Sequence, residues 1–160
     1  MELIFRETQP TDVEGLFIVR THTRENTVSR EHLAVLGITP QSVARDMASG
    51  KMKGWVCLDN ANLVGFCNGD SKTGEVLVLA VLPEYEGKGI GTRLLSHVVE
   101  HLRSIGFGAA WLATTSDSRI RAHGFYRSLG WRATGEKLAH GDEILALELN
   151  KPARPMTRGT

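Results

Sequence analysis

An apolar run, a glycine-rich turn and an amphipathic run follow one another without a break in residues 74–99, and this order constrains the fold most. Residues 76–82 are apolar at nearly every position, so we expect a strand that is covered on both faces and ends at Pro83. Apolar residues then recur at helical spacing directly after the turn: Ile90, Leu94, Leu95, Val98 and Leu102. The segment predicts a strand joined by a glycine turn to a helix N-terminus.

The turn itself contains Gly87, Gly89 and Gly91, with Lys88 among them. Glycine lets a backbone come close to a ligand, and a helix N-terminus presents unpaired N–H groups and the positive end of the helix dipole. The arrangement therefore predicts a site for a phosphate-bearing ligand. A P-loop is excluded because the chain has no G-x-x-x-x-G-K-[ST] string, and a dinucleotide fold lacks room for its second half. A turn that merely needs glycine stays open as the alternative.

Size and composition predict one globular domain over residues 1–150 and a loose tail over 151–160, which holds two prolines and several basic residues. A formal net charge of +1 argues against nucleic acid as a partner. No apolar run approaches the ~20 residues that span a bilayer, and the first residues do not resemble a signal peptide, so we expect a cytoplasmic protein without membrane contact. Cys57 and Cys67 lack metal-site spacing, as do the histidines, so we expect reduced thiols and no metal.

The periodicities predict an α/β fold, with a mixed sheet of six to seven strands and about four flanking helices on both faces. Strands are expected at residues 3–6, 55–58, 63–67, 76–82, 109–113, 131–138 and 144–149. Helices are expected from Pro10 to Arg20, at 40–48 after the N-cap Thr39, from 90 to about 104, and at 119–129 after an N-cap within 116–118. Residues 21–39 show a weaker pattern.

Two motifs resemble those of a known family. Residues 79–95, LAVLPEYEGKGIGTRLL, resemble the acyl-coenzyme A signature of the GNAT superfamily of N-acetyltransferases: Leu-Ala-Val, a Pro, then Arg or Gln-x-x-Gly-x-Gly or Ala. The match departs at Glu86, where the pattern has Arg or Gln. Residues 121–131, RAHGFYRSLGW, resemble the family's R-A-x-x-[FL]-Y-x-x-x-G-[FW] helix and turn, with Arg119 where the family often has Asn. The resemblance covers nearly the whole chain and implies a GNAT-like fold.

The resemblance also implies acetyl-coenzyme A (acetyl-CoA) as co-substrate, without a metal. Backbone N–H groups of residues 86–92 would surround the pyrophosphate, Lys88 and Arg93 would add positive charge, and the backbone of residues 79–81 would pair with the pantetheine arm. The cofactor-binding residues it implies are Leu79, Ala80, Val81, Glu86, Gly87, Lys88, Gly89, Ile90, Gly91, Thr92, Arg93 and Arg119. A carboxylate at position 86 is repelled by a diphosphate unless its side chain turns away.

Acetyl transfer to an amine needs a base for the ammonium proton and a proton donor for the leaving thiolate. Tyr126 matches the family's tyrosine and is the expected acid, the alternative being a core aromatic. Glu75, at the start of the apolar strand, stands where the family often has its base; the alternative is a solvated strand end. Asp70 and His123 are the other candidate bases.

The acceptor site is expected from the region least like the family, residues 21–54. Within it, Arg24 or Arg30 would bind a carboxylate and Glu25 an amine, while Trp55 would wall the pocket or fill the core. The acceptor would be a small-molecule or peptide amine, and a homodimer is left open. Two competing hypotheses are a non-catalytic acyl-CoA sensor or interaction module of the same fold, and a nucleotide-binding protein that uses the glycine turn.

Overall fold

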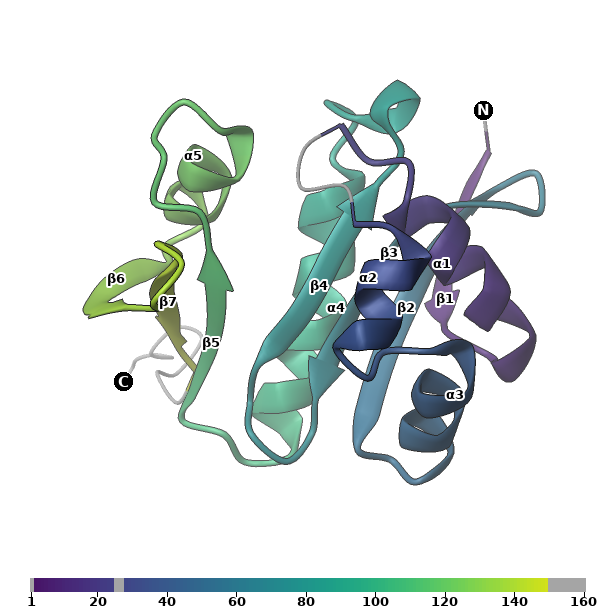
Figure 1. Ribbon diagram of the computed structural model, residues 1–160, viewed down its shortest axis with the longest axis horizontal. Helices are drawn as coiled ribbons and strands as arrows, with labels where there is room; N and C mark the ends of the chain where they lie inside the picture. Colours follow the sequence, from purple (N-terminus) through teal and green to yellow (C-terminus); the bar gives the residue numbers. More distant parts are fainter. Residues whose placement is uncertain (1, 25–27, 150–160) are drawn as a thin grey trace, which may run out of the picture.

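The computed structural model describes residues 2–24 and 28–149 (Figure 1). Along the chain the elements are β1 (Leu3–Glu7), α1 (Val13–Arg20), α2 (Arg30–Val35), α3 (Pro40–Ala48), β2 (Met52–Asp59), β3 (Asn62–Asp70), β4 (Val76–Val81), α4 (Ile90–Ser104), β5 (Ala109–Thr114), α5 (Arg121–Ser128), β6 (Arg132–Lys137) and β7 (Glu143–Glu148). Single 3₁₀ turns, η1 (Pro10–Asp12) and η2 (Pro83–Tyr85), precede α1 and follow β4. The predicted tail, residues 151–160, lies outside the described residues, as do Glu25 and Asn26.

The seven strands form two antiparallel sheets, of order β1-β2-β3-β4 and β5-β7-β6. An isolated parallel bridge between Glu75 and Trp111 joins them. The Trp111 backbone N–H donates to the Gly74 carbonyl at 3.2 Å, and its indole N–H donates to the Thr73 carbonyl at 3.1 Å. Beyond this bridge β4 and β5 separate toward the end of the molecule that carries α5 (Figure 1). The α/β class is confirmed, and the mixed sheet is split between β4 and β5.

Helices cover both faces of the four-stranded sheet, as the sequence predicts (Figure 1). On the α4 side the core contains Cys57, Val64, Cys67, Ile90, Leu94, Val98 and Leu102. On the side of α1, α2 and α3 it contains Val13, Leu16, Phe17, Leu33, Val43, Val56, Phe66 and Ala80. Burying a large apolar side chain contributes about 1.5–3 kcal/mol, so these two layers hold the sheet on which the site is built.

The expectation that residues 76–82 are covered on both faces is wrong. Val76 and Ala80 are buried, but Leu77 is 37% exposed and the remaining residues of β4 are half-buried. The physical reason is the split: β3 pairs with one edge of β4, while β5 leaves the other edge after the single bridge. The apolar side chains of β4 therefore face an opening as well as a core.

One helix boundary and one short helix also differ from the expectation. Helix α5 begins at Arg121 with Ile120 as N-cap, two residues later than predicted. The Asp117 carboxylate instead accepts from the Arg119 backbone N–H at 2.9 Å, which forms a local turn ahead of the helix. In the segment with the weaker pattern, the sequence missed the six-residue helix α2, which buries one side chain and is therefore too short to show a period.

The described helices include none that is long and apolar enough to cross a membrane.

Candidate active site

A cleft of about 1440 Å³ opens where β4 and β5 separate. One wall is the whole length of β4, and the other comprises the end of β5 and the first turns of α5. The loop after β4 and the start of α4 close one end, and the segment after α1 covers part of the mouth. The cleft thus connects the glycine turn to α5, the helix that carries Tyr126, and so brings the two sequence motifs together.

Among the described residues, no side chain caps the N-terminus of α4. Ser29 and Thr39 cap α2 and α3 by accepting a backbone N–H at 3.1 Å each, whereas the N-cap of α4 is Gly89, and its first turn contains no acidic residue. Gly87 and Gly89 have φ of +78° and +81°, and a Cβ at either position would meet no atom within 4 Å. The space beside Gly87 and Gly89 is therefore open. The first N–H groups of α4, which have no partner within a helix, and the positive end of the α4 dipole lie at this turn.

The middle of the cleft fits a narrow chain of amides. Beyond the bridge, the edge of β4 that faces β5 has no strand partner among the described residues, so its backbone groups are available to an extended ligand. Leu79 and Phe125 stand on opposite walls at Gly91: a Cβ built there would lie 3.8 Å and 3.5 Å from them. The cleft therefore suits a molecule with phosphates at one end and a linear arm that carries amides.

Tyr126 lines the cleft and is otherwise enclosed. Its ring packs edge-on against Phe125 at 5.1 Å and Trp131 at 6.0 Å, and the residue is only 9% exposed. Burial, followed by the nearby Cys67 thiol, raises the pKa of the Tyr126 phenol above its ordinary value of 10.0. The hydroxyl therefore keeps its proton throughout the physiological range and can act as a donor.

A second pocket of about 410 Å³ lies between the helices α1–α3 and the sheet. Arg20, Leu77 and Val78 line both pockets, so the two adjoin beside β4. Most of its lining is apolar: Leu16, Phe17, Leu33, Ile38, Val43, Met52, Phe66, Leu77 and Val78. Its polar lining residues are Arg20, Asp46, Lys51, Asn68 and Glu75. The Asn68 Oδ1 atom is buried and has no hydrogen-bond partner among the described residues.

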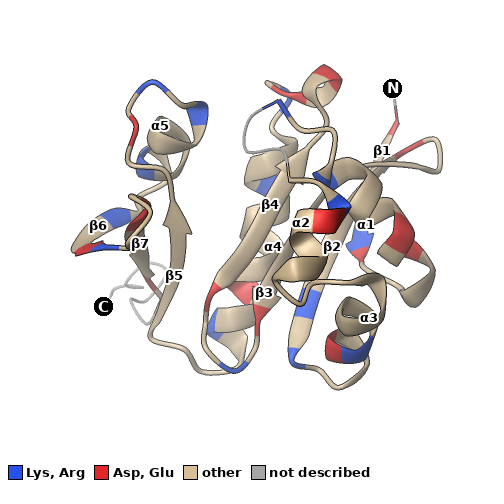
Figure 2. Cartoon of the chain, in the orientation of Figure 1, with Lys and Arg blue, Asp and Glu red and all other residues tan. Residues whose placement is uncertain are grey.

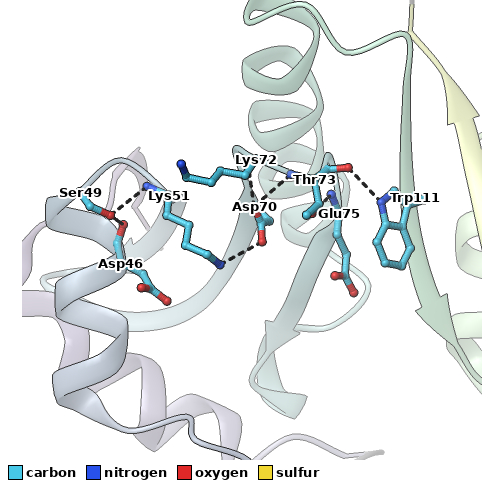
Figure 3. Close-up of polar contacts among 8 residues, drawn as sticks. All are labelled: Asp46, Ser49, Lys51, Asp70, Lys72, Thr73, Glu75 and Trp111. Carbon is cyan, nitrogen blue, oxygen red and sulfur yellow. Dashed lines mark hydrogen bonds and ion pairs between the residues drawn. The ribbon is translucent and has the colours of Figure 1, made fainter.

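Glu75 lines this second pocket. Figure 3 shows its side chain together with those of Asp70 and Lys51. Its carboxylate makes no hydrogen bond or ion pair with the described residues, while its backbone N–H donates to the Thr73 hydroxyl at 3.3 Å. Burial raises the pKa of the Glu75 carboxyl, the charge of Asp70 raises it further, and Lys51 opposes both. A carboxylate that is half-buried, unpaired and more basic than usual has the properties of a general base.

Asp70, five residues earlier, has its oxygens engaged by the protein. They accept from the backbone N–H groups of Lys72 at 2.8 Å and Thr73 at 3.1 Å, and from the Lys51 ammonium at 3.2 Å (Figure 3). Burial favours the neutral acid, but these hydrogen bonds and Lys51 outweigh it and lower the pKa of Asp70. Asp70 thus stabilises the turn before β4.

His123, the other candidate base, does not line the cleft. Its Nε2 atom lies 3.9 Å from the buried Glu143 carboxylate.

Among the described residues, no group of three or more metal-ligating side chains comes together.

The family assignment follows from comparison with known sequences. The profile described as "Acetyltransferase (GNAT) family" matches residues 19–131, which include both motifs and most of the cleft lining. The chain belongs to the GNAT acetyltransferase family. The resemblance expected from the sequence is confirmed at the level of the family.

Solved GNAT acetyltransferases share the fold. PaiA N-acetyltransferase from Thermoplasma acidophilum, in complex with coenzyme A, superposes with a TM-score of 0.76 at 20% identity, over 92% of this chain and 99% of its own. The ribosomal-protein-S18-alanine N-acetyltransferase from Escherichia coli gives 0.67 at 19% identity, over 98% and 100%. YncA from Salmonella typhimurium, with acetyl-CoA, gives 0.71 at 18% identity, over 97% and 98%.

Among curated proteins, N-acetylaspartate synthetase from Rattus norvegicus is 33% identical over 85 residues. The match spans 51% of this chain and 28% of that relative's length. This similarity therefore concerns one segment of a longer protein.

The structure brings most of the predicted cofactor residues to the cleft. Lining it are Leu79, Ala80, Val81, Glu86, Gly87, Gly89, Ile90, Gly91, Thr92 and the proposed acid Tyr126. Three predicted residues lie outside the lining. Lys88 is exposed on the turn, Arg93 packs its guanidinium 3.8 Å from the Phe5 ring centre, and Arg119 forms an exposed ion pair with Asp117 at 2.8 Å.

The predicted acceptor residues are distributed differently. Arg24 and Arg30 each bind a carboxylate, but of the chain itself: Glu86 and Glu14, respectively. Trp55 stacks on His97 at 5.5 Å against the core and is absent from the lining of both pockets. Sequence reasoning missed Arg121, although it is the Arg of the second motif, and Asp46, Lys51 and Asn68, for which no local pattern exists.

Proposed function

We propose that this chain is an N-acetyltransferase that moves the acetyl group of acetyl-CoA to a primary amine by direct attack. The observation that carries the proposal is one continuous cleft with an uncapped helix N-terminus at one end, the open edge of β4 along its length, and Tyr126 with an adjoining pocket containing Glu75. Each part matches one requirement of the reaction.

Binding of the co-substrate falls to the backbone. The N–H groups at the start of α4 and the turn at Gly87 and Gly89 would hold the pyrophosphate. The free edge of β4 at residues 79–81 would pair with the amides of the pantetheine arm, with Leu79 and Phe125 packing on either side. Acetyl-CoA, when bound there, supplies an activated acyl group.

Two side chains would then move protons. Glu75 accepts the proton of the acceptor ammonium, directly or through water, so that the neutral amine forms the new C–N bond as the C–S bond breaks. The nitrogen of the new amide then releases its extra proton to solvent. Tyr126 donates its hydroxyl proton to the leaving thiolate and is reprotonated from solvent. The raised pKa of Glu75 makes it a better base near neutrality, and the raised pKa of Tyr126 keeps it protonated until the thiolate forms.

The acceptor would enter through the second pocket. Its lining is mainly apolar and its volume is about 410 Å³, so it suits a compact amine with an alkyl or aryl body and the nitrogen directed at Glu75. Arg20 and Lys51 also line it, and the curated relative is named for N-acetylaspartate. An acidic amino acid is therefore the second acceptor class to test.

The test follows release of free thiol from acetyl-CoA with apolar amines, a diamine and aspartate, all at equal concentrations of free amine. We expect turnover, fastest with the apolar amines. Ile38→Trp should fill the rim of the second pocket and raise KM for the amine, while affinity for CoA stays unchanged. Val35→Trp, on the same segment but 83% exposed and outside the lining, is the matched control.

Three other outcomes would change the proposal. Binding of CoA without thiol release for any amine would favour the non-catalytic sensor of the same fold. Preference for aspartate would replace the apolar acceptor class, and binding of ATP or NAD in competition with CoA would favour a nucleotide site.

A further inference from the structure

Glu86 holds two arginines from opposite sides of the cleft. Its Oε1 atom accepts from the Arg24 Nε–H at 2.9 Å and lies 2.6 Å from Arg121 Nη1. Arg24 belongs to the segment after α1, and Arg121 opens α5. One carboxylate oxygen therefore joins the two parts of the molecule that the cleft separates.

The three side chains lie at the phosphate end. All of them line the cleft, together with Gly87 and Gly89 at the start of α4. Figure 2 shows basic segments at the start of α5 and after α1, with acidic positions of the loop after β4 at the same end of the molecule. An anion held by the α4 N-terminus would lie close to the Glu86 carboxylate and to both guanidinium groups.

These ion pairs are suited to exchange. The Arg24 and Arg121 side chains are 57% and 55% exposed, so solvent screens their attraction to Glu86. Guanidinium groups bind phosphates through paired N–H donors, and a phosphate offers more acceptor oxygens and more charge than one carboxylate oxygen. A phosphate that enters would therefore take over the arginines and repel Glu86.

The geometry points to Arg24 and Arg121 as the phosphate-binding side chains of the cleft, and to Glu86 as an internal substitute anion that holds them until the cofactor arrives. The inference rests on the proposed function, since it assumes CoA as the ligand. It also accounts for an acid at the position where the family pattern has Arg or Gln: the positive charge comes from two other elements. Affinity for CoA is then set by competition between Glu86 and the phosphates.

Titration calorimetry with CoA tests this on wild type, Glu86→Gln, Arg24→Gln and Arg121→Gln. Loss of a charge-assisted hydrogen bond should weaken CoA binding roughly tenfold for each arginine variant, whereas Glu86→Gln should tighten it several-fold. Arg45→Gln, an exposed α3 arginine outside both pocket linings, should bind as wild type does. Circular dichroism checks that each variant is folded.

Ligand fragments separate the phosphates. Dephospho-CoA lacks the 3′-phosphate and pantetheine lacks all phosphates, so the arginine variants should bind pantetheine as wild type does. An effect that persists with dephospho-CoA assigns the arginines to the pyrophosphate, and one that disappears assigns them to the 3′-phosphate.

A further variant distinguishes competition from simple repulsion. If Glu86 competes for the arginines, the gain from Glu86→Gln should shrink when Arg24 and Arg121 are both replaced by Gln. An equal gain in that background, weaker binding by Glu86→Gln, or unchanged binding by both arginine variants would overturn the inference and leave the proposed function intact. Failure of wild type to bind CoA would instead overturn the proposed function, and the inference with it.

Discussion

At the scale of single residues, two carboxylates that lie five residues apart in the sequence, Asp70 and Glu75, have different surroundings. The Asp70 carboxylate accepts three hydrogen bonds and has a lowered pKa, whereas the Glu75 carboxylate accepts none from the described residues and has a raised pKa. Asp70 therefore stabilises the turn at Lys72 and Thr73, whereas the Glu75 carboxylate has no partner among the described residues and lines the second pocket. The same functional group thus has a structural role at one position and, in the proposed mechanism, a catalytic one at the other.

Stability against pH should separate these roles. The folded pKa of Glu75 lies above its unfolded value, so ionised Glu75 costs stability once the pH rises through that window, and Glu75→Gln should be more stable than wild type at pH 7. The folded pKa of Asp70 is depressed, so its contribution is present above the unfolded value, and Asp70→Asn should be less stable at pH 7. Urea unfolding at pH 3 and pH 7 measures both differences, which should become smaller at pH 3.

Glu75→Gln should also lower turnover while leaving affinity for acetyl-CoA unchanged, because the proposed phosphate site lies at the other end of β4. The rate is plotted against free-amine concentration for wild type and variant, since the free amine also increases with pH. Superimposable curves would remove Glu75 from the mechanism.

Tyr126→Phe keeps the packing against Phe125 and Trp131 and removes one hydroxyl. We expect CoA affinity within a few-fold of wild type and turnover lower by roughly 10²–10⁴, the usual contribution of a general acid. Single-turnover kinetics with a slowly reacting amine makes chemistry rate-limiting. An unchanged rate there would make Tyr126 a purely structural residue.

At the scale of elements, the two glycines of the α4 turn differ in kind. Gly89 has φ of +81°, which an L-residue adopts only with strain, whereas Gly91 is helical and its missing Cβ leaves room between Leu79 and Phe125. The sequence does not distinguish these two positions. The spacing of the glycines does not show whether glycine is needed for a positive φ or for the space that a Cβ would fill.

Alanine at each position should therefore have opposite effects on stability. Gly89→Ala should destabilise the fold by about 1–2 kcal/mol through left-handed strain. Gly91→Ala should keep or raise stability, since alanine favours a helix by about 1 kcal/mol over glycine, and should still weaken CoA binding by narrowing the cleft. Thermal unfolding and calorimetry on the same samples measure both. Full CoA affinity in Gly91→Ala would show that the arm does not pass there.

The β2–β3 hairpin offers a test away from the site. Asn60 and Ala61 both have positive φ, of 51° and 73°, as a two-residue type I′ turn requires. Ala61 carries a Cβ that this backbone disfavours, so Ala61→Gly should stabilise the protein by about 1 kcal/mol without changing CoA affinity. A destabilised variant in chemical denaturation would contradict the turn geometry.

At the scale of the whole molecule, the sequence predicts the class of fold, the order of the elements apart from α2, and most of the residues that line the cleft. Local periodicity was sufficient for the elements, because it depends on neighbouring residues, whereas the cleft residues were predicted from the glycine turn and from the resemblance to the GNAT motifs. β4 and β5 are joined by an isolated bridge between Glu75 and Trp111 and separate beyond it. No local sequence pattern predicts this separation. The same holds for the contact of Arg24 and Arg121 with Glu86, which only the folded chain assembles.

The second pocket shows the same limit. Its polar residues come from α1, α3, the residue before β2, β3 and the turn before β4, and only Glu75 among them was predicted as a site residue from the family resemblance. Residues 21–54, where the sequence predicts the acceptor site, supply Leu33, Ile38, Val43, Asp46, Lys51 and Met52 to the second pocket. The sequence could not separate these from Trp55 and Arg30, which pack elsewhere.

The central claim is direct transfer of acetyl from acetyl-CoA to an amine within this cleft. The most direct measurement uses acetyl-CoA with an isotope-labelled acetyl group, and compares free thiol released with labelled amine formed. Intact-protein mass spectrometry without amine is run beside it. For direct transfer we expect equal amounts of free thiol and of amine that carries the labelled acetyl group. Tyr126→Phe should reduce both, and no labelled protein should form without amine. Labelled protein that accumulates without amine, or bound CoA with neither product for any amine, would contradict direct transfer.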